Sequence, residues 1–154
     1  MLITEVGGVL TRPSSANGKV VGTVAEGTAK DVDRAVQAAK HAFRTCWGLK
    51  TPGAQRGKLL SNLARLMEEH GNELAALESL DNGKTVANSK HIDLAMAIAT
   101  IQYYSGWADK LHGQVIETDE SKFAYTRHEP FGVVGQILPW NFPRTSTAFP
   151  ALRH

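Results

Sequence analysis

The sequence predicts an α/β fold that is rich in helix, and three observations support this. Apolar residues recur at steps of three and four through most of residues 28–111, which is the period of a helix. Beyond residue 113 the period changes to two, as in strands. A short apolar run then fills residues 132–138, of the kind that lies buried in a parallel sheet. Because one such strand has no visible partners, we expect the fold to be incomplete within these residues.

The composition is that of a globular protein of 154 residues, with 42% hydrophobic and 21% charged residues. The 17 basic residues are scattered among 15 acidic ones, which does not favour nucleic-acid binding. No apolar stretch approaches the ~20 residues that cross a bilayer, so no membrane contact is expected. A single cysteine, Cys46, cannot form an internal disulfide. A cytoplasmic location is therefore expected, with the mitochondrial matrix less favoured.

The first elements can be placed from turn and cap signals. Residues 1–27 are rich in Gly, Ser and Thr and predict loops with short strands. Thr28 and Asp31 have the spacing of a capping box, which predicts that a helix begins there. An apolar stripe continues this helix as far as Gly48. It consists of Val32, Val36, Ala39, Phe43 and Trp47.

Two further helices follow. Pro52 suits the first position of a helix because its missing N–H is not needed there, and Gly71 is a natural end. The expected buried face of this second helix comprises Leu59, Leu60, Leu63, Leu66 and Met67. A short third helix is predicted over residues 73–80, ended by the turn at residues 81–83. Its inward residues are expected to be Leu74, Leu77 and Leu80.

A long fourth helix is predicted over residues 85–111, followed by strands. Its stripe comprises Ile92, Met96, Ala99, Tyr103 and Trp107, and the small residues Ala95, Ala97 and Ala99 permit close packing. Residues 115–116 and 123–128 predict two strands around a polar turn at 118–122. Residues 132–138 predict the buried strand, which stops at Pro139.

Residues 125–143 carry the strongest motif. They include Pro139-Trp140-Asn141-Phe142-Pro143 and closely resemble the strand-and-loop motif of the aldehyde dehydrogenase family. Residues 56–60, 77–84 and 103–110 also resemble segments of that family, in the same order. The resemblance implies the N-terminal part of a Rossmann-like cofactor-binding domain. Residues 1–113 then form its helical part, residues 114–130 a β-hairpin oligomerisation arm, and residues 131–154 its first strand and a divergent tail, with the catalytic domain absent.

The resemblance also implies an activity and site residues. The family oxidises aldehydes to carboxylic acids with NAD or NADP, through a thiohemiacetal on a cysteine. Asn141 matches the residue whose amide holds the developing oxyanion, although asparagine before Phe-Pro also suits a plain turn. Ile137, Leu138, Pro139 and Trp140 match the stretch that runs along the cofactor. Phe142 matches a residue of the substrate tunnel, which the helix around Met96 also borders, although a methionine at helical spacing is more often core.

Other residues carry no catalytic signal. Cys46 is predicted at a helix C-terminus, whereas a reactive thiol favours a helix N-terminus or a cation, so we expect a structural cysteine. The six histidines show no metal-ligand spacing, and no metal is expected. Lys84 and Lys90 are expected to be ordinary solvated residues.

The sequence shows neither the nucleophilic cysteine motif nor the glutamate motif of the family, so this chain is expected to be inactive alone. Two alternatives remain. A non-catalytic module could dock on a full-length family member and form homo- or hetero-oligomers with it. An unrelated helical binding domain is much less favoured, because the matching segments occur in family order.

Overall fold

The structure is a computed structural model that describes residues 8–14, 17–139 and 141–143. The chain starts with two antiparallel strands, β1 (Val9–Pro13) and β2 (Val20–Ala25), joined through a turn at Gly18, which has a positive φ of 70°. The pairing shifts register between Arg12 and Pro13, so the ribbon carries an irregularity at its turn end. The expectation of short strands and loop is confirmed for residues 8–14 and 17–27, whereas residues 1–7 and 15–16 lie outside the described residues.

Helix α1 (Ala29–Thr45) begins where the capping box was predicted. The Thr28 hydroxyl accepts a hydrogen bond from the Asp31 amide at 3.4 Å, and the Asp31 carboxylate accepts one from the Thr28 amide at 2.9 Å. These two bonds satisfy amides that no preceding turn of helix can reach. No residue of α1 is fully buried, so the helix is held by its cap and its own hydrogen bonds more than by packing.

Helices α2 (Gly53–Glu69) and α3 (Gly71–Asn82) follow a short 3₁₀ turn, η1 (Gly48–Lys50). Pro52 occupies the N-cap position of α2, one residue before the first helical position that was predicted for it. Gly71 begins α3, which is therefore longer than predicted. Gly71 is buried, and an added Cβ there would meet a Leu94 methyl group at 3.5 Å, an ordinary van der Waals contact. Gly83 ends α3 in the left-handed conformation, as the turn signal predicted.

The predicted fourth helix differs in form. It divides into α4 (Val86–Asn88), a π-helix η2 (Ser89–Leu94) and α5 (Ala95–Ser105). A π-helix takes in an extra residue per turn, which rotates the side chains that precede it relative to those that follow. As a result, the polar residues Ser89 and Asp93 are buried together with Leu94. Helical periodicity alone gave no sign of this change.

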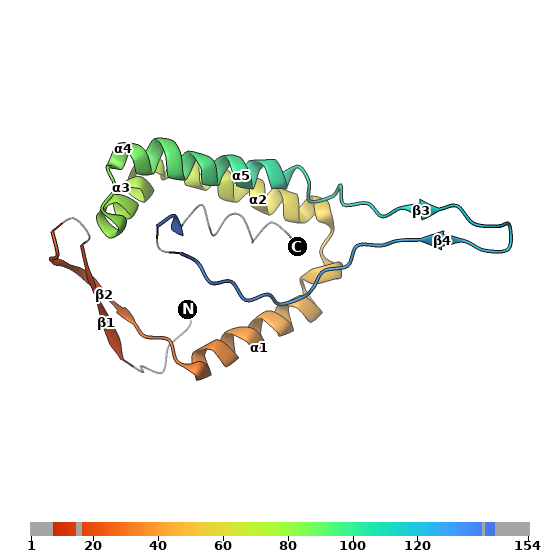
Figure 1. Ribbon diagram of the computed structural model, residues 1–154, viewed down its shortest axis with the longest axis horizontal. Coiled ribbons are helices and arrows are strands. Elements are labelled where there is room, and N and C mark those ends of the chain that lie inside the picture. Colours follow the sequence, from red (N-terminus) through yellow and green to blue (C-terminus); the bar gives the residue numbers. More distant parts are fainter. Residues whose placement is uncertain (1–7, 15–16, 140, 144–154) are drawn as a thin grey trace.

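The core lies between α2 and α5, which run side by side (Figure 1). Ala64, Ala97 and Ile101 are buried there, with Leu60, Met67 and Ile98 packed around them. The close packing expected of Ala97 is thus confirmed. Gly57 permits the approach, because a Cβ at that position would lie 2.6 Å from the Ser105 carbonyl oxygen.

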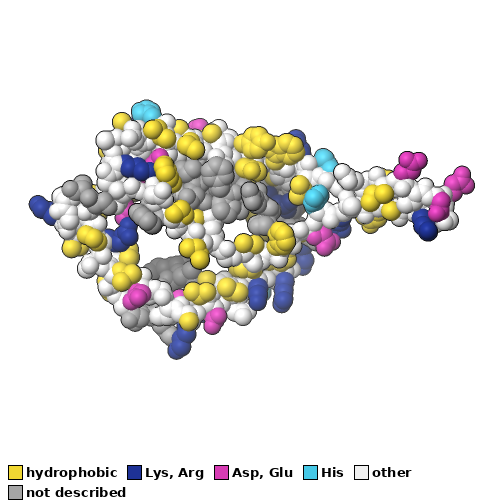
Figure 2. Space-filling model, viewed as in Figure 1, with side chains coloured by type: hydrophobic (Ala, Val, Ile, Leu, Met, Phe, Trp, Pro, Cys, Tyr) yellow, Lys and Arg dark blue, Asp and Glu magenta, His cyan; other side chains and the backbone are white. Residues whose placement is uncertain are grey.

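Most of the large residues that were expected to be inward-facing are exposed, and that expectation was wrong. The physical reason is that α2 and α5 bury mainly small side chains against each other, so their larger side chains face no neighbouring element among the described residues. Figure 2 shows apolar side chains gathered on the surface of these helices. The exposed residues of α2 and α5 are Leu59, Leu63, Leu66, Met96 and Tyr103; those of other segments are Leu77 and Leu80 in α3, Ile92 in η2, and Trp107 after α5.

A β-hairpin projects from the body (Figure 1). Its strands β3 (Val115–Ile116) and β4 (Ala124–Tyr125) pair antiparallel, with Val115 opposite Tyr125 and Ile116 opposite Ala124. The two strands were predicted, although the second is shorter than residues 123–128. At the base, a Cβ on Gly113 would lie 1.8 Å from the Thr126 carbonyl oxygen, so only glycine lets the two chains approach this closely.

The apolar segment at residues 132–138 forms no strand, and its expected burial was wrong. Ile137 is 100% exposed and Leu138 is 41% exposed. A strand of a parallel sheet exists only through hydrogen bonds to partner strands. No strand lies beside it in the described part of the chain, where the two sheets are the β1–β2 and β3–β4 ribbons.

Candidate functional site

The turn that contains Asn141 lies against the end of α3. The backbone carbonyl of Asn141 accepts a hydrogen bond from Lys84 Nζ at 2.7 Å. It accepts a second from Asn82 Nδ2 at 3.1 Å. These contacts join residues 57 and 59 positions apart in the sequence. Residues 82–84 therefore anchor the turn that contains Asn141 through these two hydrogen bonds.

Lys84 is the centre of this contact region. Its ammonium lies 2.6 Å from Asp93 Oδ2, and 3.6 Å from the centre of the Phe142 ring. The Lys84 side chain is only 23% exposed and that of Asp93 only 3%. The expectation that Lys84 is an ordinary solvated residue was therefore wrong. Lys90 does fit it, since it is exposed and its ammonium bonds Asn72 Oδ1 at 2.6 Å.

Local structure explains how these residues meet. The left-handed Gly83 turns the chain sharply at the end of α3, and the Ser79 hydroxyl donates a hydrogen bond of 2.5 Å to the Lys84 carbonyl. The π-helix η2 places Asp93 on the inner side, opposite the Lys84 ammonium. The buried carboxylate thereby gains the partner that a buried charge requires.

The arrangement leaves the Asn141 side chain available. Its backbone carbonyl is fixed by two donors, while in the described part of the chain no hydrogen bond to its side-chain amide is found. Asn141 is exposed. A neutral amide donor on an anchored turn is suited to stabilising negative charge that develops on a ligand oxygen, because the donor need not reorganise.

The other predicted site residues lie next to this turn in the chain. Ile137, Leu138 and Pro139 form an extended, exposed segment that leads into it, and Trp140 lies outside the described residues. Phe142 is partly exposed beneath the Lys84 ammonium, and Met96 is exposed on α5. The resemblance to a family motif singled out residues 137–142, but no sequence signal singled out Lys84 or Asp93.

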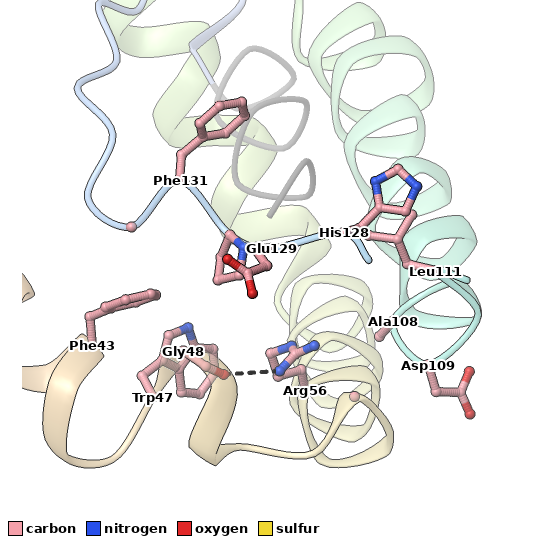
Figure 3. Close-up of a pocket in the computed structure, with 13 residues that line it drawn as sticks. Phe43, Trp47, Gly48, Arg56, Ala108, Asp109, Leu111, His128, Glu129 and Phe131 are labelled. Atoms are coloured by element: carbon pink, nitrogen blue, oxygen red, sulfur yellow. Dashed lines mark hydrogen bonds between the residues drawn. The ribbon is translucent and has the colours of Figure 1, made fainter. Parts of the chain in front are cut away.

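A cavity of about 610 Å³ lies elsewhere, between the end of α1, the start of α2 and residues 128–132 (Figure 3). None of the predicted site residues lines it. Its cation, Arg56, already donates to the carbonyls of Gly48, at 3.3 Å, and Thr51. Arg56 thus fastens the connection between α1 and α2, and we assign the cavity no catalytic role.

Charge and metal chemistry are sparse in the described residues. The Lys110 ammonium, which donates a 2.8 Å hydrogen bond to Asp109, holds the pKa of that carboxyl below its ordinary value.

Within the described ranges, no group of three or more His, Cys, Asp or Glu residues could hold a metal ion. No helix among them is long and apolar enough to cross a membrane. Cys46 is an exposed free thiol at the C-cap of α1.

Comparison with known proteins places these features in a family. The profile of the aldehyde dehydrogenase family matches residues 8–152. An aldehyde dehydrogenase of Agaricus bisporus is 57% identical over 128 residues, which are 83% of this chain and 26% of that protein. The human mitochondrial aldehyde dehydrogenase is 51% identical over 130 residues, 83% of this chain and 25% of that protein.

Solved structures agree. A putative aldehyde dehydrogenase from Burkholderia cenocepacia superimposes with a TM-score of 0.90 at 42% identity, over 94% of this chain and 29% of that one. An NAD⁺ complex of the Bacillus cereus enzyme gives 0.89 at 40% identity, over 93% of this chain and 29% of that one. The chain therefore spans about a quarter of the curated relatives that it matches. On the profile match, the sequence identity and the shared fold together, the chain belongs to the aldehyde dehydrogenase family.

Proposed function

We propose that this chain supplies the oxyanion-holding turn of an NAD(P)-dependent aldehyde dehydrogenase, with Asn141 as the donor. The observation that carries this proposal is the anchored carbonyl of Asn141, which fixes the backbone while leaving the side-chain amide available. When an aldehyde carbonyl is attacked, its oxygen gains negative charge. An amide that is already aimed at that oxygen stabilises the transition state more than the ground state.

Cofactor contact is proposed for the segment that precedes the turn. Ile137 and Leu138 expose apolar side chains, and residues 133–139 leave their backbone outside any sheet. An exposed, extended segment of this kind can lie along a dinucleotide, with its apolar side chains against the rings and its free backbone against the polar groups. Pro139 and Trp140 complete the proposed contact. A bound NAD or NADP would supply the hydride acceptor for the oxidation, and these residues would hold it against the turn.

The attacking sulfur is proposed to come from outside these residues. Cys46 lies at the C-cap of α1 and takes no part in the contacts around Asn141. Its Sγ donates to the Ala42 carbonyl at 3.6 Å, as a structural thiol does. A cytoplasmic location and the division of the chain at residues 113 and 130 stay predictions.

A chimera tests the proposal. The 154-residue chain replaces the segment that it matches in the Agaricus bisporus enzyme, and aldehyde-dependent reduction of NAD is followed. We expect activity, and Asn141→Ala should lower kcat by about 10²–10³-fold, the usual cost of one oxyanion donor. Asn88→Ala, at an exposed asparagine in α4, is the matched control and should leave kcat unchanged.

Two results would overturn the proposal. One is a chimera in which Asn141→Ala keeps full activity. The other is turnover by the 154-residue chain alone that Cys46→Ser abolishes, because the nucleophile would then lie inside the chain.

The hairpin favours a second function, docking on another subunit. Val115, Phe123 and Tyr125 are largely exposed on it, and the rings of Phe123 and Tyr125 lie 5.8 Å apart. Exposed apolar groups on a projecting arm are typical of subunit contacts. Co-expression with a tagged full-length relative should retain the chain on the affinity resin, and Phe123→Ser with Tyr125→Ser should release it. Elution of the unaltered chain in the flow-through would count against this function.

A further inference from the structure

We propose that Lys84 is a positioning residue for Asn141, and that the π-helix η2 exists to supply Asp93 as its counter-charge. This inference rests on the proposed function of Asn141 and deepens it. Lys84 touches neither aldehyde nor cofactor in this assignment. It acts by fixing the peptide from which the Asn141 side chain projects.

The geometry supports a positioning role. Lys84 Nζ contacts the Asn141 carbonyl at 2.7 Å and the face of the next residue, Phe142, at 3.6 Å. The Lys84 ammonium therefore contacts two consecutive residues of the turn, Asn141 and Phe142. Holding the carbonyl fixes the plane of the peptide that follows Asn141, and it restricts the movement of the Asn141 Cα, which lies in that plane. An amide displaced by as little as ~1 Å loses much of its catalytic value.

A lysine alone cannot hold the turn in one position, because its side chain has many rotamers and its ammonium is strongly hydrated. Asp93 removes that freedom. Its carboxylate is 97% buried by the surrounding chain, being only 3% exposed, and lies 2.6 Å from Nζ. The pair is thus largely shielded from water, unlike the exposed pairs Arg65–Glu69 and Lys110–Asp109. Shielded pairs are also less weakened by salt.

The π-helix accounts for the position of Asp93. A regular α-helix through residues 86–105 would carry its inward stripe on apolar residues, as the sequence predicts. The wider turn at residues 89–94 instead buries Asp93 beside Leu94. Such π segments persist at a cost and are frequently found at functional sites. Here the segment delivers a carboxylate to the lysine that holds the turn.

A double-mutant cycle in the active chimera tests the inference. We expect Lys84→Met to lower kcat by about 10–100-fold, the scale expected for a misplaced group, with the KM for NAD unchanged. Lys84→Arg should recover part of the loss, because it keeps the charge and the donors. Lys90→Met is the matched control, because Lys90 lies in η2, the segment of Asp93, but bonds Asn72 on the surface, and it should have no effect.

The decisive arm repeats Lys84→Met in the Asn141→Ala background. A positioning residue acts through Asn141, so the second substitution should cause no further loss, whereas a merely stabilising lysine would add its own loss. An additive loss overturns the inference and leaves the proposed function standing. Full activity of Asn141→Ala alone overturns the proposed function instead.

A measurement on the 154-residue chain keeps the inference testable without catalysis. In ¹⁵N relaxation, Lys84→Met should lower the backbone order parameters of Asn141 and Phe142 from about 0.85 towards about 0.6, and Lys90→Met should not. Order parameters that are equal in the unaltered chain and in Lys84→Met would overturn it.

Discussion

The α2–α5 pair and the segment at residues 131–143 are both apolar in sequence, yet only the first has a buried core. Ala64, Ala97 and Ile101 pack between the two helices, whereas Ile137 is fully exposed. The difference lies in where the partner surface comes from. Each of the two helices satisfies its own backbone and finds the other a few tens of residues away in the same chain. A parallel strand can do neither without further strands.

The comparison also separates stability from function. The helices are held by packing that the chain supplies itself. The turn to which we assign the proposed function is held by a few polar contacts to Asn82 and Lys84, while its apolar side chains stay exposed. Substitutions in the two regions should therefore act on different quantities: the free energy of unfolding in the first, and binding or catalysis in the second.

The largest expected effect contrasts two isoleucines. Ile101→Ala removes a side chain that is 4% exposed, and we expect the free energy of unfolding to fall by about 2–5 kcal/mol. Ile137→Ala removes one that is 100% exposed and should change it by less than about 0.5 kcal/mol. Urea unfolding followed by circular dichroism measures both. Equal losses would mean that residues 131–143 are packed in solution.

A pair of glycines tests the same contrast from the opposite direction. Gly57→Ala places a methyl group 2.6 Å from the Ser105 carbonyl, so α2 and α5 must separate, at a cost of about 1–3 kcal/mol. Gly135→Ala meets nothing within 4 Å and should be neutral, or stabilising by about 0.4–1 kcal/mol through the unfolded chain. Thermal unfolding gives the order of the two variants, and a reversed order would contradict the close packing of α2 on α5.

Much of the helical part could be predicted from the sequence because its signals are local. The Thr28–Asp31 box, Gly83 and the turn between β3 and β4 depend on neighbours within a few residues. The π-helix could not be predicted, and neither could the contact of its Asp93 with Lys84, nine positions earlier in the chain. Periodicity records which residues are apolar and not where an extra residue is taken in.

Local sequence signals predict even less of the candidate site, because its contacts join residues that are far apart in the chain. The motif at residues 139–143 could be recognised by resemblance, so Asn141 was singled out without any structure. Lys84 was expected to be solvated, since a lysine next to a glycine turn normally is. Only the folded chain brings it against the Asn141 carbonyl, across 57 residues. Burial was overestimated for the same reason. An apolar stripe shows which face of a helix can pack against a neighbouring element, but it does not show whether these residues include that element.

Helix α1 allows a smaller test, because it has a cap but no fully buried residue. Thr28→Ala removes both the acceptor of the Asp31 amide and a donor to its carboxylate, so we expect a loss of about 1 kcal/mol in unfolding free energy. Thr45→Ala, whose hydroxyl donates to the His41 carbonyl at the other end, should cost less than about 0.5 kcal/mol. Similar losses for the two would show that α1 does not depend on its first turn.

The smallest effect is expected in the hairpin turn, which projects from the body with its charged residues at the tip (Figure 2). The Ser121 hydroxyl and the Ser121 amide, the latter at 3.0 Å, donate to Asp119 and hold the pKa of this carboxyl below its ordinary value. A lowered pKa in the folded state means that the carboxylate stabilises the turn above the ordinary pKa and that this support is lost as the pH falls through the lowered one.

Ser121→Ala removes the largest of these causes, so the pKa of Asp119 should rise towards its ordinary value. Lys122→Met removes a smaller one and should raise the pKa less. An NMR titration of the Asp119 side-chain carboxyl carbon measures all three proteins. Because every group that lowers this pKa lies in the turn itself, the titration should be the same in the Ile101→Ala variant below its unfolding transition. A titration midpoint of Asp119 that differs in the Ile101→Ala variant would show that the hairpin is coupled to the α2–α5 core. The hairpin turn would then not be held by its own residues alone.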